Sequence, residues 1–181
     1  MAKIFIGLMS GTSADSIDCA TLDLSTEKIN ILGCNNFDIP KDLKAEIIRC
    51  SQSEEVGEEL VESLNFKMAK VLVSSVKEVI DEFNINIKDV IAIGSHGQTI
   101  KHEPRSKNPY SLQIGDPQKI SNDLNVTTIG NFRDHDIEAG GEGAPLTPLF
   151  HEKVFGRDKK RKAIINIGGI TNITALDYPE V

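Results

Sequence analysis

The sequence predicts an α/β domain with a mixed central sheet and flanking helices. Two observations support this prediction. Three short apolar runs separated by turn residues come first, as in an antiparallel meander, and a long amphipathic helix then precedes a single buried strand. A long helix ahead of an apolar strand is typical of a crossover that returns the chain to the same sheet.

The first half of the chain supplies the meander and the main helix. We expect strands over residues 3–9, 17–24 and 29–37. Pro40 then opens a short helical stretch, because proline is well tolerated at the start of a helix. A longer helix is expected over 57–83, where apolar residues recur every three or four positions.

The second half of the chain alternates strands, turns and helices. A buried strand is expected over 89–94, ending in the polar turn 95–99, and ligands bind where such strands end. A glycine-rich loop and a short helix precede the last apolar run. The remaining expected elements are a strand over 111–115, a helix over 117–124, a strand over 126–132 and a strand over 163–168.

Length and charge limit the function classes. With 181 residues and 39% hydrophobic content, the chain is long enough for one packed domain and the beginning of a second. It has 20 basic and 27 acidic residues, which gives no positive field for nucleic acid or anionic membrane. We therefore expect small-molecule and protein partners.

Cysteine use and the N-terminus predict a cytoplasmic location. Cys19, Cys34 and Cys50 are widely spaced and form no CxxC pair, as expected of free thiols in a reducing compartment. The apolar run 4–9 is interrupted by Gly7 and is too short for a signal peptide or a membrane span.

The turn between the first two expected strands is a candidate phosphate site. Glycine permits close backbone approach there, and hydroxyls and amides are available to face a phosphate. The turn is not a Walker P-loop, which needs GxxxxGK[ST] before a helix. Asp15 and Asp18 are candidates to hold a hydrated magnesium ion. An ordinary hairpin turn is the alternative. The candidate nucleotide-binding residues are Gly11, Thr12, Ser13, Ala14, Asp15, Ser16, Ile17 and Asp18.

Residues 131–145 are the densest candidate for chemistry. They combine an arginine, a histidine, four carboxylates and three glycines after an expected strand. A kinase needs a carboxylate to take a proton from its nucleophile and a cation or amide nest to stabilise phosphoryl transfer. Asp136 is the preferred base and Asp134 the second choice. The alternative is a solvated charged loop with a glycine-rich tail.

Polar residues near the expected strand ends are suited to hydrogen-bonding a sugar. The alternative for His96 is a structural histidine, which is the more common role of a single histidine after a strand. The absence of an HExxH motif or a Cys/His cluster argues against catalytic zinc. The candidate substrate-binding residues are Ser95, His96, Gly97, Gln98, Asp116 and Arg133.

A faint internal repeat relates residues 4–13 to residues 164–172, both of which are apolar strands that turn at small hydroxyl-bearing residues. The second copy predicts another phosphate hairpin, formed by Asn166, Gly168, Gly169 and Asn172. A bulge at the glycine pair is the alternative. We therefore expect one lobe over 1–161, with only the first hairpin of a second lobe over 162–181.

Five ordered motifs together resemble one family. GLMSGTSADSID, IGSHGQTIKHEP, LQIGDPQKIS, NFRDHDIEAGGEGAPLTPLFH and INIGGITNIT are similar to successive signatures of the anhydro-N-acetylmuramic acid kinases. The resemblance implies a ribonuclease H-like (actin-like ATPase) domain and a two-lobed kinase that binds ATP and magnesium. The implied substrate is 1,6-anhydro-N-acetylmuramic acid from cell-wall peptidoglycan turnover. By motif position, Asp136 matches the aspartate that activates water, and residues 11–18 match the ATP-binding stretch.

The sequence departs from the family pattern in three respects. Ser16 stands where the family usually has glycine, and would crowd the hairpin if that position needed a positive φ. Asn131 stands where aspartate is usual. The family's second half is missing, so we expect a homodimer or a C-terminal lobe supplied by a separate chain. A sugar sensor and a water-activating phosphatase remain as alternative functions.

Overall fold

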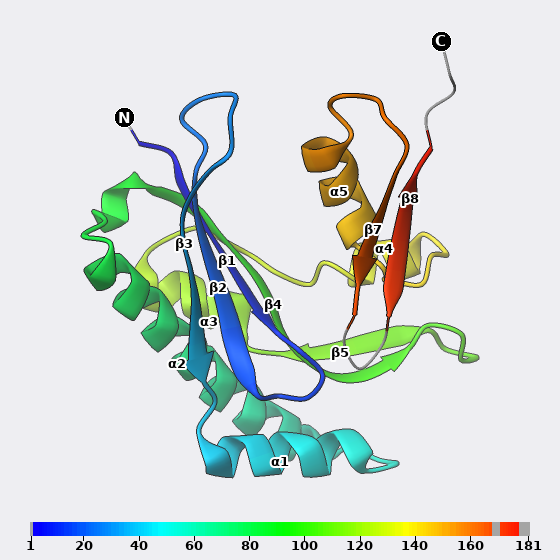
Figure 1. The fold of residues 1–181 in the computed structure, drawn as a ribbon. Helices are drawn as coiled ribbons and strands as arrows, with labels where there is room; N and C mark the ends of the chain where they lie inside the picture. Colours follow the sequence, from blue (N-terminus) through cyan, green and yellow to red (C-terminus); the bar gives the residue numbers. More distant parts are fainter. Residues whose placement is uncertain (1, 168–170, 178–181) are drawn as a thin grey trace.

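The computed structural model describes residues 2–167 and 171–177 and contains one large sheet (Figure 1). The sheet has the strand order β3-β2-β1-β4-β5, and β6 pairs with β4 off this path. β1 is antiparallel to β2 and parallel to β4, so the sheet is mixed as predicted. Its strands are β1 (Ile4–Ser10), β2 (Ser16–Asp23), β3 (Asn30–Asp38), β4 (Val90–Glu103), β5 (Tyr110–Ile114) and β6 (Thr128–Ile129).

One face of the sheet builds the core. Ile4, Ile6 and Leu8 alternate with more exposed residues along β1, and the buried residues Ile17 and Cys19 do the same along β2. This period of two places the apolar side chains on one face, where their burial stabilises the domain. The predicted meander is therefore confirmed, with strand limits within one residue of those expected.

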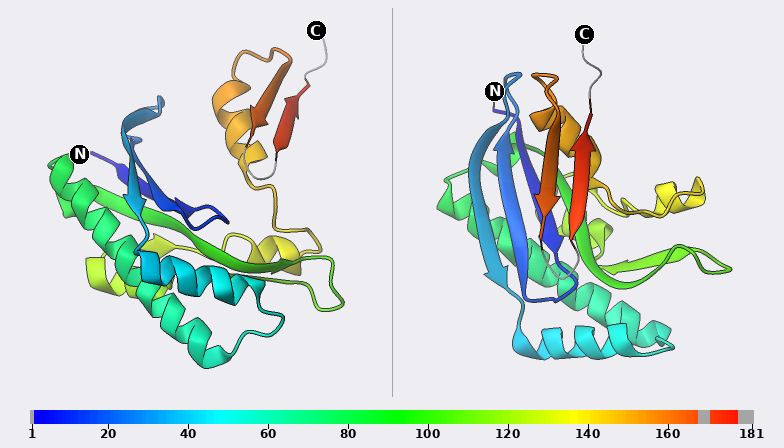
Figure 2. Two further views of the ribbon diagram at one scale, coloured as in Figure 1. Left: turned by 60° about the horizontal axis from the view of Figure 1, so that its bottom comes forward. Right: turned by 45° about the vertical axis from the view of Figure 1, so that its right-hand side comes forward.

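Three helices cover that face, as the left view of Figure 2 shows: α1 (Lys41–Gln52), α2 (Glu58–Glu82) and α3 (Pro117–Leu124). A 3-10 turn, η1 (Ile87–Asp89), connects α2 to β4. The fully buried residues Leu64, Met68 and Leu72 lie three to four residues apart on α2, which gives this helix its apolar stripe. The predicted crossover helix is confirmed.

The main correction concerns β4. The strand does not end at Gly94, and residues 95–99 are not a turn, because β4 continues to Glu103. Between Ser95 and Gln98 its pairing with β1 shifts register, and Gly97 has φ +65°. A side chain at Gly97 would overlap the carbonyl oxygen of Ile114. The polar sequence therefore forms a bulge within a long strand.

The chain beyond α3 is less regular than predicted. The strand expected over 126–132 is reduced to the two residues of β6. The glycine-rich loop contains a short helix, α4 (Asp134–Glu138), and α5 (Thr147–Phe155) follows it. β7 (Lys162–Asn166) and β8 (Asn172–Leu176) form a separate antiparallel sheet, on the opposite side of the main sheet from α1, α2 and α3 (Figure 2).

Within residues 2–167 and 171–177, no helix combines the length and apolar character needed to cross a membrane.

Substitution of Leu72 tests the packing between α2 and the sheet. Leu72 is fully buried and its Cδ1 lies against Gly115, so Leu72→Ala should lower the free energy of unfolding by about 2 to 5 kcal/mol. Leu149 on α5 is 79% exposed, so Leu149→Ala is the matched control. It should change the free energy of unfolding by less than about 0.5 kcal/mol. Urea unfolding of both variants measures the difference, and equal effects would contradict the described core.

Candidate functional site

A cavity of about 240 Å³ lies at the bulge of β4 and the start of α3. It brings together four of the six predicted substrate-binding residues from two separate sequence motifs: Ser95, His96, Gly97 and Asp116. Its other lining residues are Asn65, Gln113, Ile114, Gly115, Pro117 and Asn131. Most of the polar groups are neutral amides and hydroxyls, which suit the hydroxyls of a sugar.

Local sequence explains the shape of this cavity. Gly115 has φ +107° and its N–H donates to Asn65 Oδ1 at 2.8 Å, so α2 fixes the turn after β5. Asp116 then caps α3 by accepting from the Gln118 N–H at 2.8 Å, and Pro117 occupies the first helical position. Sequence analysis missed Asn65, which sits among apolar neighbours on α2 without a distinguishing pattern.

Gln98 occupies a different place from the other predicted substrate residues. It is fully buried, and its Oε1 accepts a hydrogen bond from Ser10 Oγ at 2.7 Å. Its Nε2 donates to the Thr99 carbonyl at 3.1 Å. The Gln98 amide therefore ties β4 to the end of β1, and Gln98 does not line the cavity.

The preferred base, Asp136, lies on α4 and is held by the glycine-rich loop. Its Oδ2 accepts a hydrogen bond from the Gly143 N–H at 2.6 Å, and its carbonyl accepts one from the Gly141 N–H at 2.7 Å. A β-carbon at Gly141 would lie 2.6 Å from Asp136 Cγ, and Gly143 has φ +66°. Both glycines are therefore needed for the loop to close around this carboxylate.

Arg133 links the loop to the cavity. Its Nε and Nη2 lie 3.3 and 3.2 Å from His96 Nε2, and its Nη1 donates to the Gly143 carbonyl at 3.4 Å. The His96 ring also stacks on Phe132, with ring centroids 6.4 Å apart. Burial and, secondarily, the Arg133 charge lower the pKa of His96 to about 4. His96 is therefore neutral near pH 7.

A surface ion pair ties the same loop to the β4–β5 hairpin. Arg105 Nε lies 2.7 Å from Glu142 Oε1, and both side chains are largely exposed. The hydrogen bond with Arg105 lowers the pKa of Glu142, and the reciprocal contact raises the pKa of Arg105. An exposed pair of this kind contributes little stability, whereas the contacts of Arg133 with the same loop are partly buried.

The β1–β2 turn is tight at the predicted nucleotide-binding residues. Ala14 is fully buried with φ +50°, and its N–H donates to the Gly11 carbonyl at 3.0 Å. Thr12 and Ser13 are exposed at the tip, and Ile17 is buried in the core. Ser16 begins β2 and is not among the residues of positive φ, so the steric concern about serine at this position does not apply.

The two candidate magnesium residues point to opposite faces of the sheet. Asp15 forms an ion pair with Lys44 of α1, on the helical side, and its hydrogen bond with Lys44 lowers the pKa of Asp15. Asp18 lies on the other face and accepts from Asn36 Nδ2 at 2.8 Å. Among the described residues there is no group of three or more His, Cys, Asp or Glu able to hold a metal. Asp15 and Asp18 therefore do not meet at one ion.

The predicted second hairpin is described in part. Asn166 and Asn172 pair at the ends of β7 and β8, whereas Gly168 and Gly169 lie outside the described residues. These ends of β7 and β8 point toward the same end of the molecule as the β1–β2 turn (Figures 1 and 2).

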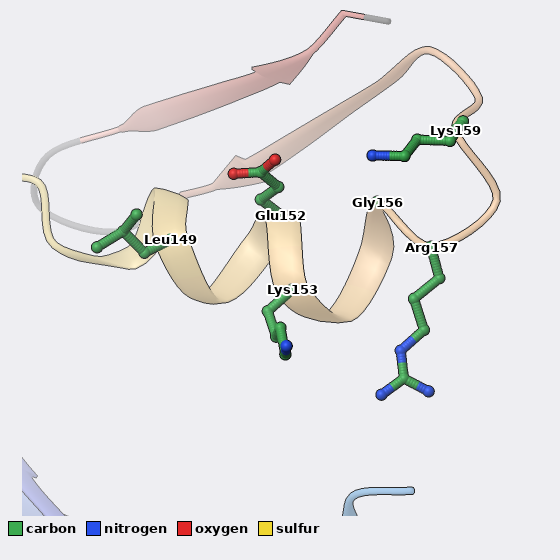
Figure 3. A pocket seen from close by; sticks show the side chains of 6 residues that line it. All are labelled: Leu149, Glu152, Lys153, Gly156, Arg157 and Lys159. Atoms are coloured by element: carbon green, nitrogen blue, oxygen red, sulfur yellow. The ribbon is translucent and has the colours of Figure 1, made fainter. Parts of the chain in front are cut away.

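A second cavity, of about 330 Å³, lies along α5 and contains none of the predicted site residues. Figure 3 shows Lys153 and Arg157 extending to one side of the helix and Glu152 to the other. Arg157 Nη2 donates to the Glu27 carbonyl at 3.3 Å. This cavity therefore lies apart from the Asp136 loop.

Asn131 stands where the family pattern has aspartate. It has φ +54°, in the left-handed region that asparagine adopts more readily than most residues. It lines the cavity between β6 and α4.

The mixed sheet, the helices on one face and the glycine-bearing β1–β2 turn define an α/β domain with the fold of the actin-like ATPases. A family model described as "Anhydro-N-acetylmuramic acid kinase" matches residues 3–180. The chain belongs to the anhydro-N-acetylmuramic acid kinase family, as the five motifs indicated.

Similar curated proteins carry the same family name. Anhydro-N-acetylmuramic acid kinase from Shewanella frigidimarina is 40% identical over 174 residues, and that from Vibrio vulnificus strain YJ016 is 32% identical over the same length. Each alignment covers 96% of this chain and 47% of the relative. The enzyme from Sulfurimonas denitrificans is 35% identical over 176 residues, covering 97% of this chain and 48% of the relative. The chain thus spans about half the length of these relatives.

The bond between Asp136 and Gly143 predicts a local effect of substitution. In Asp136→Ala the Gly143 amide loses a charge-assisted hydrogen bond of about 1.5 to 3 kcal/mol, so its hydrogen exchange should accelerate roughly tenfold or more. Asp134→Ala, which removes the second candidate base on the same helix, is the matched control and should leave this amide unchanged. NMR-detected exchange compares them, and equal rates in the two variants would refute the described loop.

Proposed function

We propose that this chain forms the sugar-binding lobe of an ATP-dependent kinase that opens 1,6-anhydro-N-acetylmuramic acid with water and phosphorylates O6, producing N-acetylmuramate 6-phosphate for peptidoglycan recycling. The observation that carries the proposal is the placement of Asp136 on a glycine-rich loop that Arg133 connects to the polar cavity. Family membership supports the choice of substrate. We place this activity in the cytoplasm.

Asp136 acts as the general base in this proposal. Its carboxylate takes a proton from the attacking water, whose oxygen joins the anomeric carbon while the bond from that carbon to O6 breaks. The released O6 then accepts the phosphoryl group. The Gly143 N–H holds Oδ2 of Asp136, which fixes the direction of the carboxylate while Oδ1 stays available to water.

The residues around the β1–β2 turn fit a nucleotide phosphate. Gly7 pairs with Ala20 on β2 and with Gly94 on β4, on the sheet face away from the helices. Because these residues have small side chains or none, a ligand can approach the backbone closely on this face near the turn. We propose that the amides and hydroxyls of residues 11–16 bind the phosphates of ATP, which supplies the transferred group. Asp18 is the carboxylate on this face suited to hydrated magnesium, and Asn166 and Asn172 face the phosphates from β7–β8.

The rest of the site requires a further polypeptide in this proposal. Ile165 and Ile173 on the β7–β8 sheet are more than half exposed. Exposed apolar side chains of this kind favour association of the sheet with another polypeptide. We propose that either a C-terminal lobe or a second copy of the chain covers them.

Calorimetric titration with 1,6-anhydro-N-acetylmuramic acid tests the proposal, with and without magnesium and a non-hydrolysable ATP analogue. Sugar binding that strengthens with nucleotide supports a kinase. Sugar binding indifferent to nucleotide supports a sensor, and the absence of sugar binding contradicts the assigned site.

Substitution of the base separates binding from chemistry. Asp136→Asn should keep sugar affinity within about threefold but lower turnover by about 10² to 10⁴, the typical contribution of a general base. Turnover is measured with the chain mixed with a polypeptide equivalent to the remaining half of a relative. Asp134→Asn is the matched control and should retain activity. Phosphate release without sugar would instead favour a phosphatase.

A further inference from the structure

Arg133 makes three hydrogen bonds in the described site. Two of its nitrogens approach the same atom, His96 Nε2, and the third donates to the Gly143 carbonyl. Gly143 in turn donates its N–H to Asp136. One peptide group therefore connects the guanidinium to the proposed base, and His96 completes the chain of contacts at the cavity wall.

The chemistry of arginine determines the protonation of His96. A guanidinium only donates hydrogen bonds, so a ring nitrogen that receives its N–H groups must carry a lone pair. His96 Nε2 is therefore unprotonated, and the single proton of the neutral ring lies on Nδ1. Burial beside the Arg133 charge, which lowers the pKa of His96 to about 4, agrees with this assignment.

The assigned tautomer leaves one donor for a ligand. His96 lines the cavity, and its Nδ1 forms no hydrogen bond with residues 2–167 or 171–177. Nδ1–H can donate to a hydroxyl, ether or carbonyl oxygen. It cannot serve as a base in this form, because its lone-pair nitrogen is occupied by Arg133.

We infer that Arg133 is a positioning residue: it fixes His96 as an Nδ1–H donor toward an acceptor oxygen of the bound sugar, and through Gly143 it fixes the carboxylate of Asp136. The parts that concern the sugar and the role of Asp136 in the reaction rest on the proposed function. The tautomer and the loop contact belong to the free protein. Arg133 thus orients His96 directly and holds the glycine-rich loop through the Gly143 carbonyl.

The matched variants are Arg133→Met and Arg105→Met. Both remove an arginine that contacts the glycine-rich loop, but Arg105 pairs with the Glu142 side chain and has no contact with His96. Long-range proton–nitrogen NMR correlation of the imidazole reports the tautomer and the pKa of His96 directly. This measurement needs neither ligand nor turnover.

We expect wild-type His96 to be the Nδ1–H tautomer with a pKa near 4. In Arg133→Met we expect mixed tautomers, a higher pKa that stays below the ordinary 6.5 because burial remains, and faster exchange of the Gly143 amide. Arg105→Met should match the wild type in all three. A wild-type His96 that is protonated on Nε2, or that titrates near 6.5, would overturn the inference even if Arg133→Met fails to fold.

Sugar affinity tests the second part. An asparagine amide can replace the Nδ1–H donor, so His96→Asn should bind the sugar within about threefold of wild type, whereas His96→Ala should lose about tenfold, the worth of one hydrogen bond. Equal losses in both variants would contradict a donor role. If the expected tautomer is found but wild-type protein binds no sugar, the proposed function fails while the assigned positioning of His96 by Arg133 holds.

Discussion

The bulge at Gly97 is the constraint on which the site depends. β4 pairs with β6 before the bulge, with β5 beyond it and with β1 on both sides of it, so this one strand joins all three neighbours in the sheet. Only glycine fits at this position, because its φ is +65° and a side chain would overlap the carbonyl of Ile114. The bulge places His96 beside Arg133 and opens the cavity at the start of α3. Without it, the polar residues of β4 would alternate across a regular sheet.

Hydrogen bonding by backbone groups organises the remainder of the site. The Gly143 carbonyl accepts from Arg133 and the Gly143 N–H donates to Asp136, so one peptide group holds both side chains from seven and ten residues further along the chain. This arrangement leaves part of the Asp136 carboxylate available to water. Glycine at 141 and 143 is the sequence requirement for it, because side chains there would displace Asp136 or Arg133.

Sequence alone predicted the helices and most strands because their apolar periodicity is strong, as in the stripe of Leu64, Met68 and Leu72 on α2. It also singled out residues 131–145 as the densest candidate for chemistry, and the structure shows that this segment contains α4 and a glycine-rich loop that binds Asp136. It failed at β4, where polar residues suggested a turn although Gln98 is satisfied inside the protein by Ser10. It gave no signal for Asn65. It also grouped Asp15 with Asp18, whereas contacts with residues far away in sequence, Lys44 for Asp15 and Asn36 for Asp18, place the two carboxylates on different faces of the sheet.

Chemical-shift mapping by NMR tests the central claim most directly. The chain is titrated with 1,6-anhydro-N-acetylmuramic acid, and the backbone amide shifts are followed. The proposed site predicts the largest changes at the bulge of β4, at residues 113–116 and at the glycine-rich loop around Asp136. Changes confined to the α5 cavity, or an absence of changes at saturating sugar, would contradict the assignment of the sugar site to this lobe.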